Sequence, residues 1–194
     1  MKVRMLLLAT IGLLGGAALG HAASGSAGIQ AGINRPPSNL SRAVGDGFHA
    51  GFSVGIVDAR NEVGIDATYH VFAEKTSVTQ ILGPTTVTER ARLLEFALCF
   101  RAFIAPKHFR TVPYIKAGFG AHNVTADVLM TSPYFTLPIH SSEWWPGILG
   151  GVGVSTPLGN GGGLCLEGLF HRTQSSEPAD FFTLALAYRS NAGR

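Results

Sequence analysis

The stretch from residue 47 to residue 57 alternates strictly between two kinds of side chain. The residues of one parity are apolar: Phe48, Ala50, Phe52, Val54 and Ile56. The residues of the other parity are small or polar: Gly47, His49, Gly51, Ser53 and Gly55. Because successive side chains of a strand point to opposite faces, this pattern predicts a β-strand with one apolar face. A strand of a soluble sandwich gives the same pattern, so the rest of the chain has to distinguish the two cases.

The alternation recurs along the chain and predicts eight strands in all. The other seven are expected at residues 26–33, 62–73, 88–103, 112–128, 143–156, 162–172 and 180–189. The segment 88–103 lacks Gly and Pro and could form a helix, but Leu94, Phe96 and Leu98 alternate with other residues and favour a strand. An even number of strands is what a small up-and-down barrel requires, so we predict an all-β, eight-stranded antiparallel barrel.

The predicted connections differ in length according to the end of the strands at which they lie. Long loops containing Pro are expected at 34–45, 74–87 and 129–142, after the first, third and fifth strands. Tight turns are expected at 58–61 and 157–161, after the second and sixth strands. Outer-membrane barrels show this asymmetry, with short periplasmic turns and longer extracellular loops. We therefore expect the three long loops to contact an extracellular partner that the sequence does not identify.

The beginning of the chain predicts export. Lys2 and Arg4 precede a short apolar run at 6–14, and small residues follow near 20–23. This is the pattern of a cleaved signal peptide, which we assign to residues 1–22, and the run is too short for a comfortable membrane span. Residues 23–194 are expected to form a single barrel domain. Charged residues make up 14% of the sequence, against roughly 25% in ordinary soluble domains, which favours a bacterial outer-membrane barrel whose outer face contacts lipid.

The parity opposite to the apolar one predicts the contents of the barrel interior. Nine charged or imidazole side chains fall on it: Asp66, His70, Glu95, Arg101, Lys116, His122, Glu167, His171 and Arg189. We expect them to pair in the lumen, because an isolated buried charge is costly, and we expect the many glycines to make room for them. Five aromatic residues near the predicted strand ends are expected to form an interfacial girdle: Tyr69, Tyr114, Trp144, Trp145 and Tyr188.

Three segments carry a resemblance to a known family: Pro113-Tyr114-Ile115-Lys116-Ala117-Gly118-Phe119-Gly120, Gly150-Gly151-Val152-Gly153-Val154 and Glu167-Gly168-Leu169-Phe170-His171. With them, residues 26–188 resemble the OmpA/OmpX-like small outer-membrane β-barrels, the "porin family". The resemblance implies a Gram-negative outer membrane, eight strands, a plugged or narrow lumen and insertion by the barrel-assembly machinery. Such barrels usually end on an aromatic residue, whereas here residues 189–194 follow the last aromatic residue, Tyr188.

Motifs for small-molecule chemistry are weak in this sequence. The Gly-x-Gly pairs have no completing glycine or helix in register, so no dinucleotide is expected, and a net charge of +3 without a basic cluster argues against nucleic acid. A metal site requires ligands that converge, and His49, His70, His122 and His171 lie on different predicted strands. We assign the four as hydrogen-bonding residues and predict no catalytic residue, cofactor or metal ligand.

Two alternatives to a structural or surface-contact barrel are kept. His171-Arg172-Thr173 with Glu177 resembles the His-x-Ser and Glu triad of outer-membrane lipid A deacylases, although Thr replaces Ser and His171 has the interior parity. A soluble periplasmic barrel that binds an apolar ligand would place the apolar parity inside. The two cysteines, Cys99 and Cys165, fall on strands that are not neighbours and are predicted to be free thiols.

Overall fold

The computed structural model describes residues 24–37, 40–58, 60–80, 83–104, 110–159, 161–175 and 178–192. The predicted signal peptide lies outside the described residues. The elements, in chain order, are β1 (Ser24–Arg35), η1 (Leu40–Arg42, a 3-10 helix), β2 (Gly47–Val57), β3 (Asn61–Phe72), β4 (Lys75–Gln80), β5 (Pro84–Phe103), β6 (Val112–Thr131), β7 (Thr136–Leu158), β8 (Gly162–Thr173) and β9 (Asp180–Ala192). No helix among the described residues is long and apolar enough to span a membrane.

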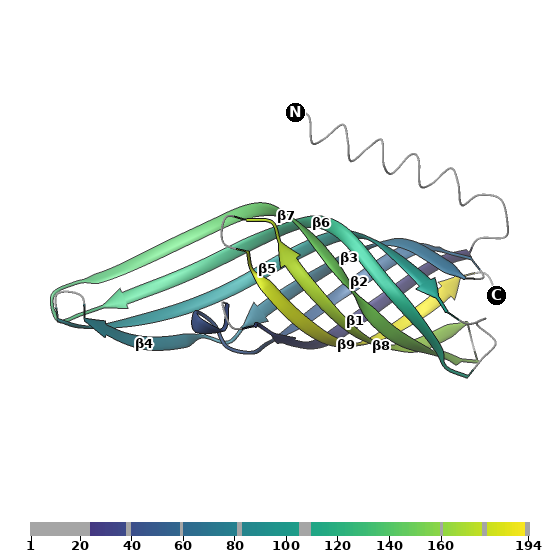
Figure 1. Ribbon diagram of the computed structural model, residues 1–194, viewed down its shortest axis with the longest axis horizontal. Coiled ribbons are helices and arrows are strands. Elements are labelled where there is room, and N and C mark those ends of the chain that lie inside the picture. The colour runs from purple at the N-terminus through teal and green to yellow at the C-terminus, as the bar shows by residue number, and fades with distance from the viewer. Residues whose placement is uncertain are drawn as a thin grey trace, which may run out of the picture.

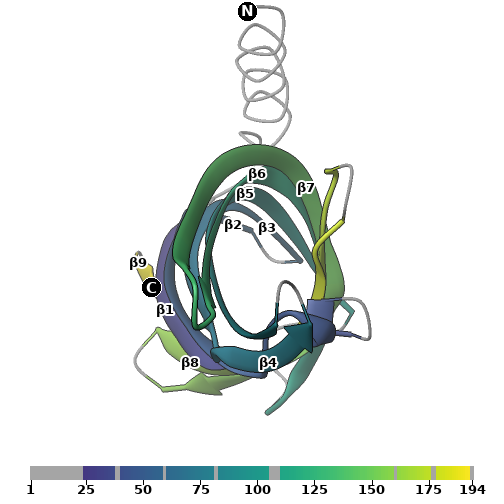
Figure 2. The same cartoon turned by 90° about the vertical axis from the view of Figure 1, so that its left-hand side faces the viewer.

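Eight of the strands close into an antiparallel ring in the order β1-β2-β3-β5-β6-β7-β8-β9. Antiparallel pairing of β1 with β9, from Gly25 opposite Ala192 to Arg35 opposite Phe182, closes the ring. Figure 1 shows the tilted strands from the side, and Figure 2 shows them arranged around a common axis. The predicted eight-stranded barrel is confirmed, including a strand rather than a helix over 88–103. The last strand continues to Ala192, so residues 189–192 belong to the ring and do not trail after it.

The predictions of long loops at 74–87 and 129–142 are wrong. Within 74–87 the chain forms β4, which pairs with the beginning of β5. Within 129–142 strand β6 runs on to Thr131 and β7 begins at Thr136, so this segment is the tip of a long hairpin. Pro138 is tolerated because this part of β7 is an edge, since β7 pairs with β8 only from Gly147 onward. The loop between β1 and β2 does exist and carries η1.

Strands β5, β6 and β7 are much longer than the other strands of the ring. They contain 20, 20 and 23 residues, whereas the remaining ring strands contain 11 to 13. Their excess length projects from one end of the barrel, where β4 adds a fourth strand beside β5 (Figure 1). We call this projection, made of β4 and of residues 84–92, 124–131 and 136–146, the extended sheet.

The two parities face as predicted. Large apolar side chains lie outside the ring, as shown by exposed fractions of 60% for Phe48, 57% for Phe52 and 49% for Ile56. Charged side chains lie inside, as shown by an exposed fraction of 1% for both Glu95 and Lys116. This arrangement is opposite to that of a soluble barrel with an apolar interior, and that alternative is therefore wrong.

The aromatic girdle is present in part. Tyr69, Trp144 and Tyr188 are exposed on the outer surface, and Trp144 stacks on Phe96 with ring centroids 6.3 Å apart. Tyr114 does not belong to the girdle, because it is buried in the lumen. Its position follows from its parity, which it shares with the interior residues Lys116 and Gly118 on β6.

Candidate functional site

The barrel interior contains two polar layers separated along the axis. We call the first the ionic layer, which consists of Glu62, Asp66, Arg101, Lys116, Glu167 and Arg189. We call the second the histidine layer, which consists of Glu95 with His49, His70, His122 and His171. An apolar plug of Val44, Phe72, Leu93 and Phe181 packs beside the histidine layer, on the side of the loop that carries η1.

The ionic layer pairs three cations with three carboxylates. Lys116 Nζ lies 2.7 Å from Asp66 Oδ2 and 2.8 Å from Glu167 Oε2. Arg101 reaches Glu62 at 2.9 Å and Asp66 at 3.1 Å. Arg189 joins Glu62 at 3.0 Å and Glu167 at 3.4 Å. Every member therefore contacts at least two groups of opposite charge, which is the condition under which buried ions are tolerated.

Tyr114 and a glycine complete the ionic layer. The Tyr114 hydroxyl donates a hydrogen bond of 2.7 Å to Glu167 Oε1. A Cβ atom at Gly153, on the adjacent strand β7, would lie 2.5 Å from Tyr114 Cζ. The ring therefore fits only because residue 153 has no side chain, as the glycine content of the interior parity predicts.

The histidine layer surrounds a single carboxylate with four imidazoles. His171 Nδ1 donates to Glu95 Oε2 at 2.8 Å, and His171 Nε2 lies 3.1 Å from Thr183 Oγ1. His122 Nε2 lies 3.0 Å from the same Glu95 oxygen. Asn34 Oδ1 accepts from His49 Nδ1 at 2.8 Å and from His70 Nδ1 at 3.2 Å. His70 is also in ring contact with His49, His171 and Phe181, so the layer is closely packed.

Two nitrogen atoms of this layer, His70 Nε2 and His122 Nδ1, have no polar partner within the part of the chain that the structure describes. Side-chain ligand atoms of His70, Glu95 and His171 all lie within 4.8 Å of one another, and all three residues are buried. These residue types, at this mutual distance, are those that could hold a metal ion.

The structure places all nine sequence-predicted interior residues in the two layers. The ionic layer contains Asp66, Arg101, Lys116, Glu167 and Arg189. The histidine layer contains the remaining four, His70, Glu95, His122 and His171. Sequence reasoning missed Glu62, which has the same parity as Asp66 and could have been found by extending the alternation. The assumption that the histidines do not converge is wrong, because strands that are distant in sequence face one another across the lumen.

The deacylase-like group does not face lipid. His171 is 2% exposed and is hydrogen-bonded to Glu95 and Thr183 inside the barrel. Thr173 is fully buried, and its Oγ1 accepts the Ala179 N–H at 2.8 Å. Glu177 lies outside the described residues. A lipid substrate outside the ring therefore has no access to His171 and Thr173.

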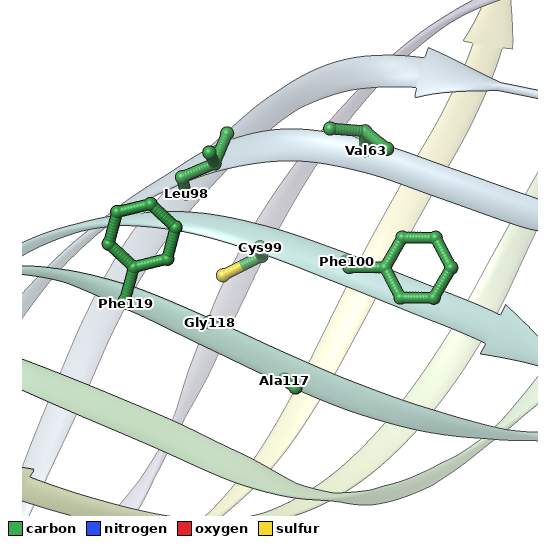
Figure 3. A pocket seen from close by; sticks show the side chains of 7 residues that line it. All are labelled: Val63, Leu98, Cys99, Phe100, Ala117, Gly118 and Phe119. Atoms are coloured by element: carbon green, nitrogen blue, oxygen red, sulfur yellow. The ribbon is translucent and has the colours of Figure 1, made fainter. Parts of the chain in front are cut away.

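A shallow pocket lies on the outer surface of the ring, over β3, β5 and β6. It has a volume of about 290 Å³ and is lined by Val63, Leu98, Cys99, Phe100, Ala117, Gly118 and Phe119 (Figure 3). Ala117 and Gly118 leave a notch between the two phenylalanine rings. The lining has almost no polar surface, so the pocket suits an apolar chain without selecting its chemistry.

Cys99 and Cys165 are free thiols, as predicted.

The extended sheet carries a small polar group of its own. Asp127 accepts hydrogen bonds from His140, at 2.6 Å, and from Arg92. All three side chains are on the projection, beyond the apolar belt of the ring. These hydrogen bonds, with that of His140 the stronger cause, lower the pKa of Asp127 below its usual value of 3.8.

Comparison with known proteins identifies the fold. No protein-family model and no curated protein matches this sequence. Among solved structures, Neisserial surface protein A (NspA) is 15% identical with a TM-score of 0.61, over 88% of this chain and 99% of that one. The N-terminal β-barrel domain of Pseudomonas aeruginosa OprF is 13% identical with a TM-score of 0.48, over 84% and 96%. The outer membrane enzyme PagL is 13% identical with a TM-score of 0.44, over 85% and 98%.

The closed ring, its apolar outer face and its charged interior define the class of protein. It is an integral β-barrel of the outer-membrane type. The likeness to NspA shows the same fold and carries no information on activity.

Proposed function

We propose that the protein is a small barrel of the bacterial outer membrane with a structural and surface-contact role. The observation that carries this proposal is the inversion of the usual arrangement, with phenylalanines and isoleucines exposed and ion pairs buried. Exposure of that apolar outer face to water is unfavourable, whereas contact with the hydrocarbon of a bilayer stabilises it. Export by a signal peptide at residues 1–22, a single barrel domain at 23–194 and insertion by the barrel-assembly machinery belong to the same proposal.

The ionic layer serves to hold the barrel closed. Its ion pairs connect β3, β5, β6, β8 and β9 across the lumen. The cavity between the two layers, lined by His49, Asp66, Lys116 and His171 among others, has a volume of only about 10 Å³, which is about the size of one water molecule. Such an interior supports a role as a rigid anchor and not as a pore.

The extended sheet is the contact surface. Its β7 strand is exposed on both faces from Thr136 to Trp144, and its outer edge has no partner strand over that length among the described residues. Large apolar side chains are exposed on it and on the turn that joins β6 to β7: Val78, Leu129, Tyr134, Leu137 and Ile139. Exposed apolar groups beyond the membrane favour a protein or lipid partner outside the cell.

Fractionation and surface labelling test this proposal. The protein should stay with outer membranes after a carbonate wash and should show heat-modifiable mobility in gels. An epitope inserted between Ser132 and Phe135 should be detected on intact cells. The matched control is the same epitope between Leu158 and Gly161, which should be detected only after lysis. Release by carbonate would disprove membrane integration, and a shielded epitope at 132–135 would disprove the surface role.

A further inference from the structure

We propose that His70, Glu95 and His171 form a binding site for one divalent transition-metal ion of the Zn²⁺ class, with His122 as a further ligand. This proposal goes beyond the structural role of the barrel and does not depend on the extended sheet. The three residues come from β3, β5 and β8, and their ligand atoms lie within 4.8 Å of one another. His122, from β6, is opposite Glu95 in the strand register, and its Nε2 is 3.0 Å from Glu95 Oε2.

The ligand types select the class of ion. Imidazole nitrogen with one carboxylate oxygen suits Zn²⁺ and neighbouring metals such as Co²⁺ and Ni²⁺, whereas Ca²⁺ and Mg²⁺ prefer oxygen ligands only. Two or three histidines with one glutamate are a common zinc ligand set. A tetrahedral ion with bonds of about 2.0–2.2 Å spaces its ligand atoms evenly. Ligand atoms now up to 4.8 Å apart have to approach, and those now 2.8 Å and 3.0 Å from Glu95 Oε2 have to move slightly away, so binding requires small rotations of the side chains.

The unpartnered nitrogens are the independent observation. His70 is fully buried, and its Nε2 has no hydrogen bond within the described residues. The same is true of His122 Nδ1, whereas His122 Nε2 lies 3.0 Å from Glu95 Oε2. Burying a polar atom without a partner is costly, so natural proteins rarely leave two in one place without a reason. A metal ion bound to His70 Nε2 would give that atom a partner.

Neighbouring groups orient two of the proposed ligands. Asn34 Oδ1 accepts a hydrogen bond from His70 Nδ1, which leaves His70 Nε2 as the atom with a free lone pair. Thr183 Oγ1 contacts His171 Nε2, while His171 Nδ1 points to Glu95. Support of this kind fixes the tautomer and the orientation of metal-binding histidines in known sites.

The size and the seclusion of the site point to one small occupant. His70, Glu95, His171 and Lys116 are among the residues that line the cavity of about 10 Å³, which admits a single ion or water molecule. The apolar plug covers the layer on the side of η1, and the ionic layer lies on the other side. We therefore expect the ion to enter while the barrel folds, and to displace the proton that His171 shares with Glu95.

Metal analysis of refolded protein tests the proposal. The mature chain is refolded in detergent with Zn²⁺, washed with EDTA, and its zinc content is measured by mass spectrometry, with heat-modifiable mobility as the test of folding. We expect close to one zinc per chain in the wild type and little in His70→Ala, His171→Ala and Glu95→Gln. His49→Gln is the matched control in the same layer, and His140→Ala is the control on the extended sheet; both should keep the zinc.

X-ray absorption at the zinc edge of the wild type gives an answer even if the variants do not fold. Scattering from at least two imidazoles and an oxygen ligand is expected. Folded wild type without zinc would overturn the proposal, as would folded His70→Ala and His171→Ala that keep a full equivalent. A zinc shell made only of water oxygens, or zinc lost from His140→Ala alone, would show adventitious surface binding and would overturn it as well.

Discussion

The ionic layer matches three cations with three carboxylates, whereas the histidine layer places four imidazoles around the single carboxylate of Glu95. Both layers are buried in the same lumen and are built from side chains of the same strand parity. A full charge without a partner is so costly that an ionic layer has to complete its own pairing. A neutral imidazole costs less to bury, so a histidine layer can persist with free nitrogens. The ionic layer therefore stabilises the fold, and the histidine layer retains nitrogen atoms that can bind a metal ion.

Removal of a shared carboxylate should have the largest effect. Glu167→Ala deprives Lys116, Arg101 and Arg189 of a partner at once and should cost about 3–5 kcal/mol in the free energy of unfolding. Urea unfolding in lipid vesicles, followed by tryptophan fluorescence, measures it. The exposed Glu143→Ala is the control and should change stability by no more than about 0.5 kcal/mol. Equal stability of the two variants would contradict a structural role for the ionic layer.

Filling the space beside each layer should show how tightly each one is packed. A Cβ atom at Gly153 meets the Tyr114 ring, and one at Gly147 overlaps the His122 ring. We expect about 1–3 kcal/mol of destabilisation from Gly153→Ala, because Tyr114 is anchored by its bond to Glu167. Gly147→Ala should cost a comparable amount, because its Cβ atom would meet both the His122 ring, which Glu95 holds, and the backbone carbonyl oxygen of Arg172.

The control for both glycine variants is Gly168→Ala, where a Cβ atom has nothing within 4 Å. Its unfolding midpoint should match that of the wild type. If Gly153→Ala or Gly147→Ala unfolded at the midpoint of Gly168→Ala, the layer beside that glycine would be loosely packed, contrary to the contacts of its Cβ atom.

Loss of Asn34 should affect the histidine layer in two separate ways. Asn34→Ala removes the acceptor shared by His49 and His70, which should cost about 1 kcal/mol of stability without metal. It should also weaken zinc binding by about 10–100-fold, because His70 loses its orienting partner. Competition with a zinc chelator measures the second effect. The control is Asn123→Ala on β6, where the side chain is hydrogen-bonded to Ser142. An unchanged zinc affinity in Asn34→Ala would argue against the assigned His70 tautomer.

The smallest effect is expected on the extended sheet, where the polar group is exposed. The pKa of Asp127 is lowered in the folded state by hydrogen bonds from His140 and Arg92. Its stabilising contribution is therefore complete above the unfolded pKa near 3.8 and disappears as the pH falls through the lower, folded value. Amide hydrogen exchange of the β6–β7 hairpin between pH 5 and pH 2 should show faster opening at the lower pH. The difference in opening between the two pH values should be smaller in high salt. Asp127→Asn should remove the pH dependence; a hairpin that opens equally at both pH values would contradict the assignment.

The sequence predicted the ring and its two faces because a strand repeats every two residues, so local alternation assigns each side chain to the inside or the outside. Phe52 and Ile56 could be placed against lipid, and Asp66 and Lys116 in the lumen, without knowledge of the partner strands. Local alternation was insufficient for β4 and the extended sheet. Polar residues and prolines in 74–87 and 129–142 are typical of loops, and the pairing that makes them strands comes from the neighbouring strand.

What the sequence determined by itself, then, was the parity of each strand, the number of ring strands and, apart from Glu62, the set of ions that had to be buried. What only the tertiary structure decided was which of these ions and imidazoles meet. His171 and Glu95 are 76 residues apart, and they touch because ring closure and the stagger between strands bring β8 to face β5 across the lumen. No local pattern encodes a distance across a ring, and for that reason the convergence of the histidines became visible only in the folded barrel.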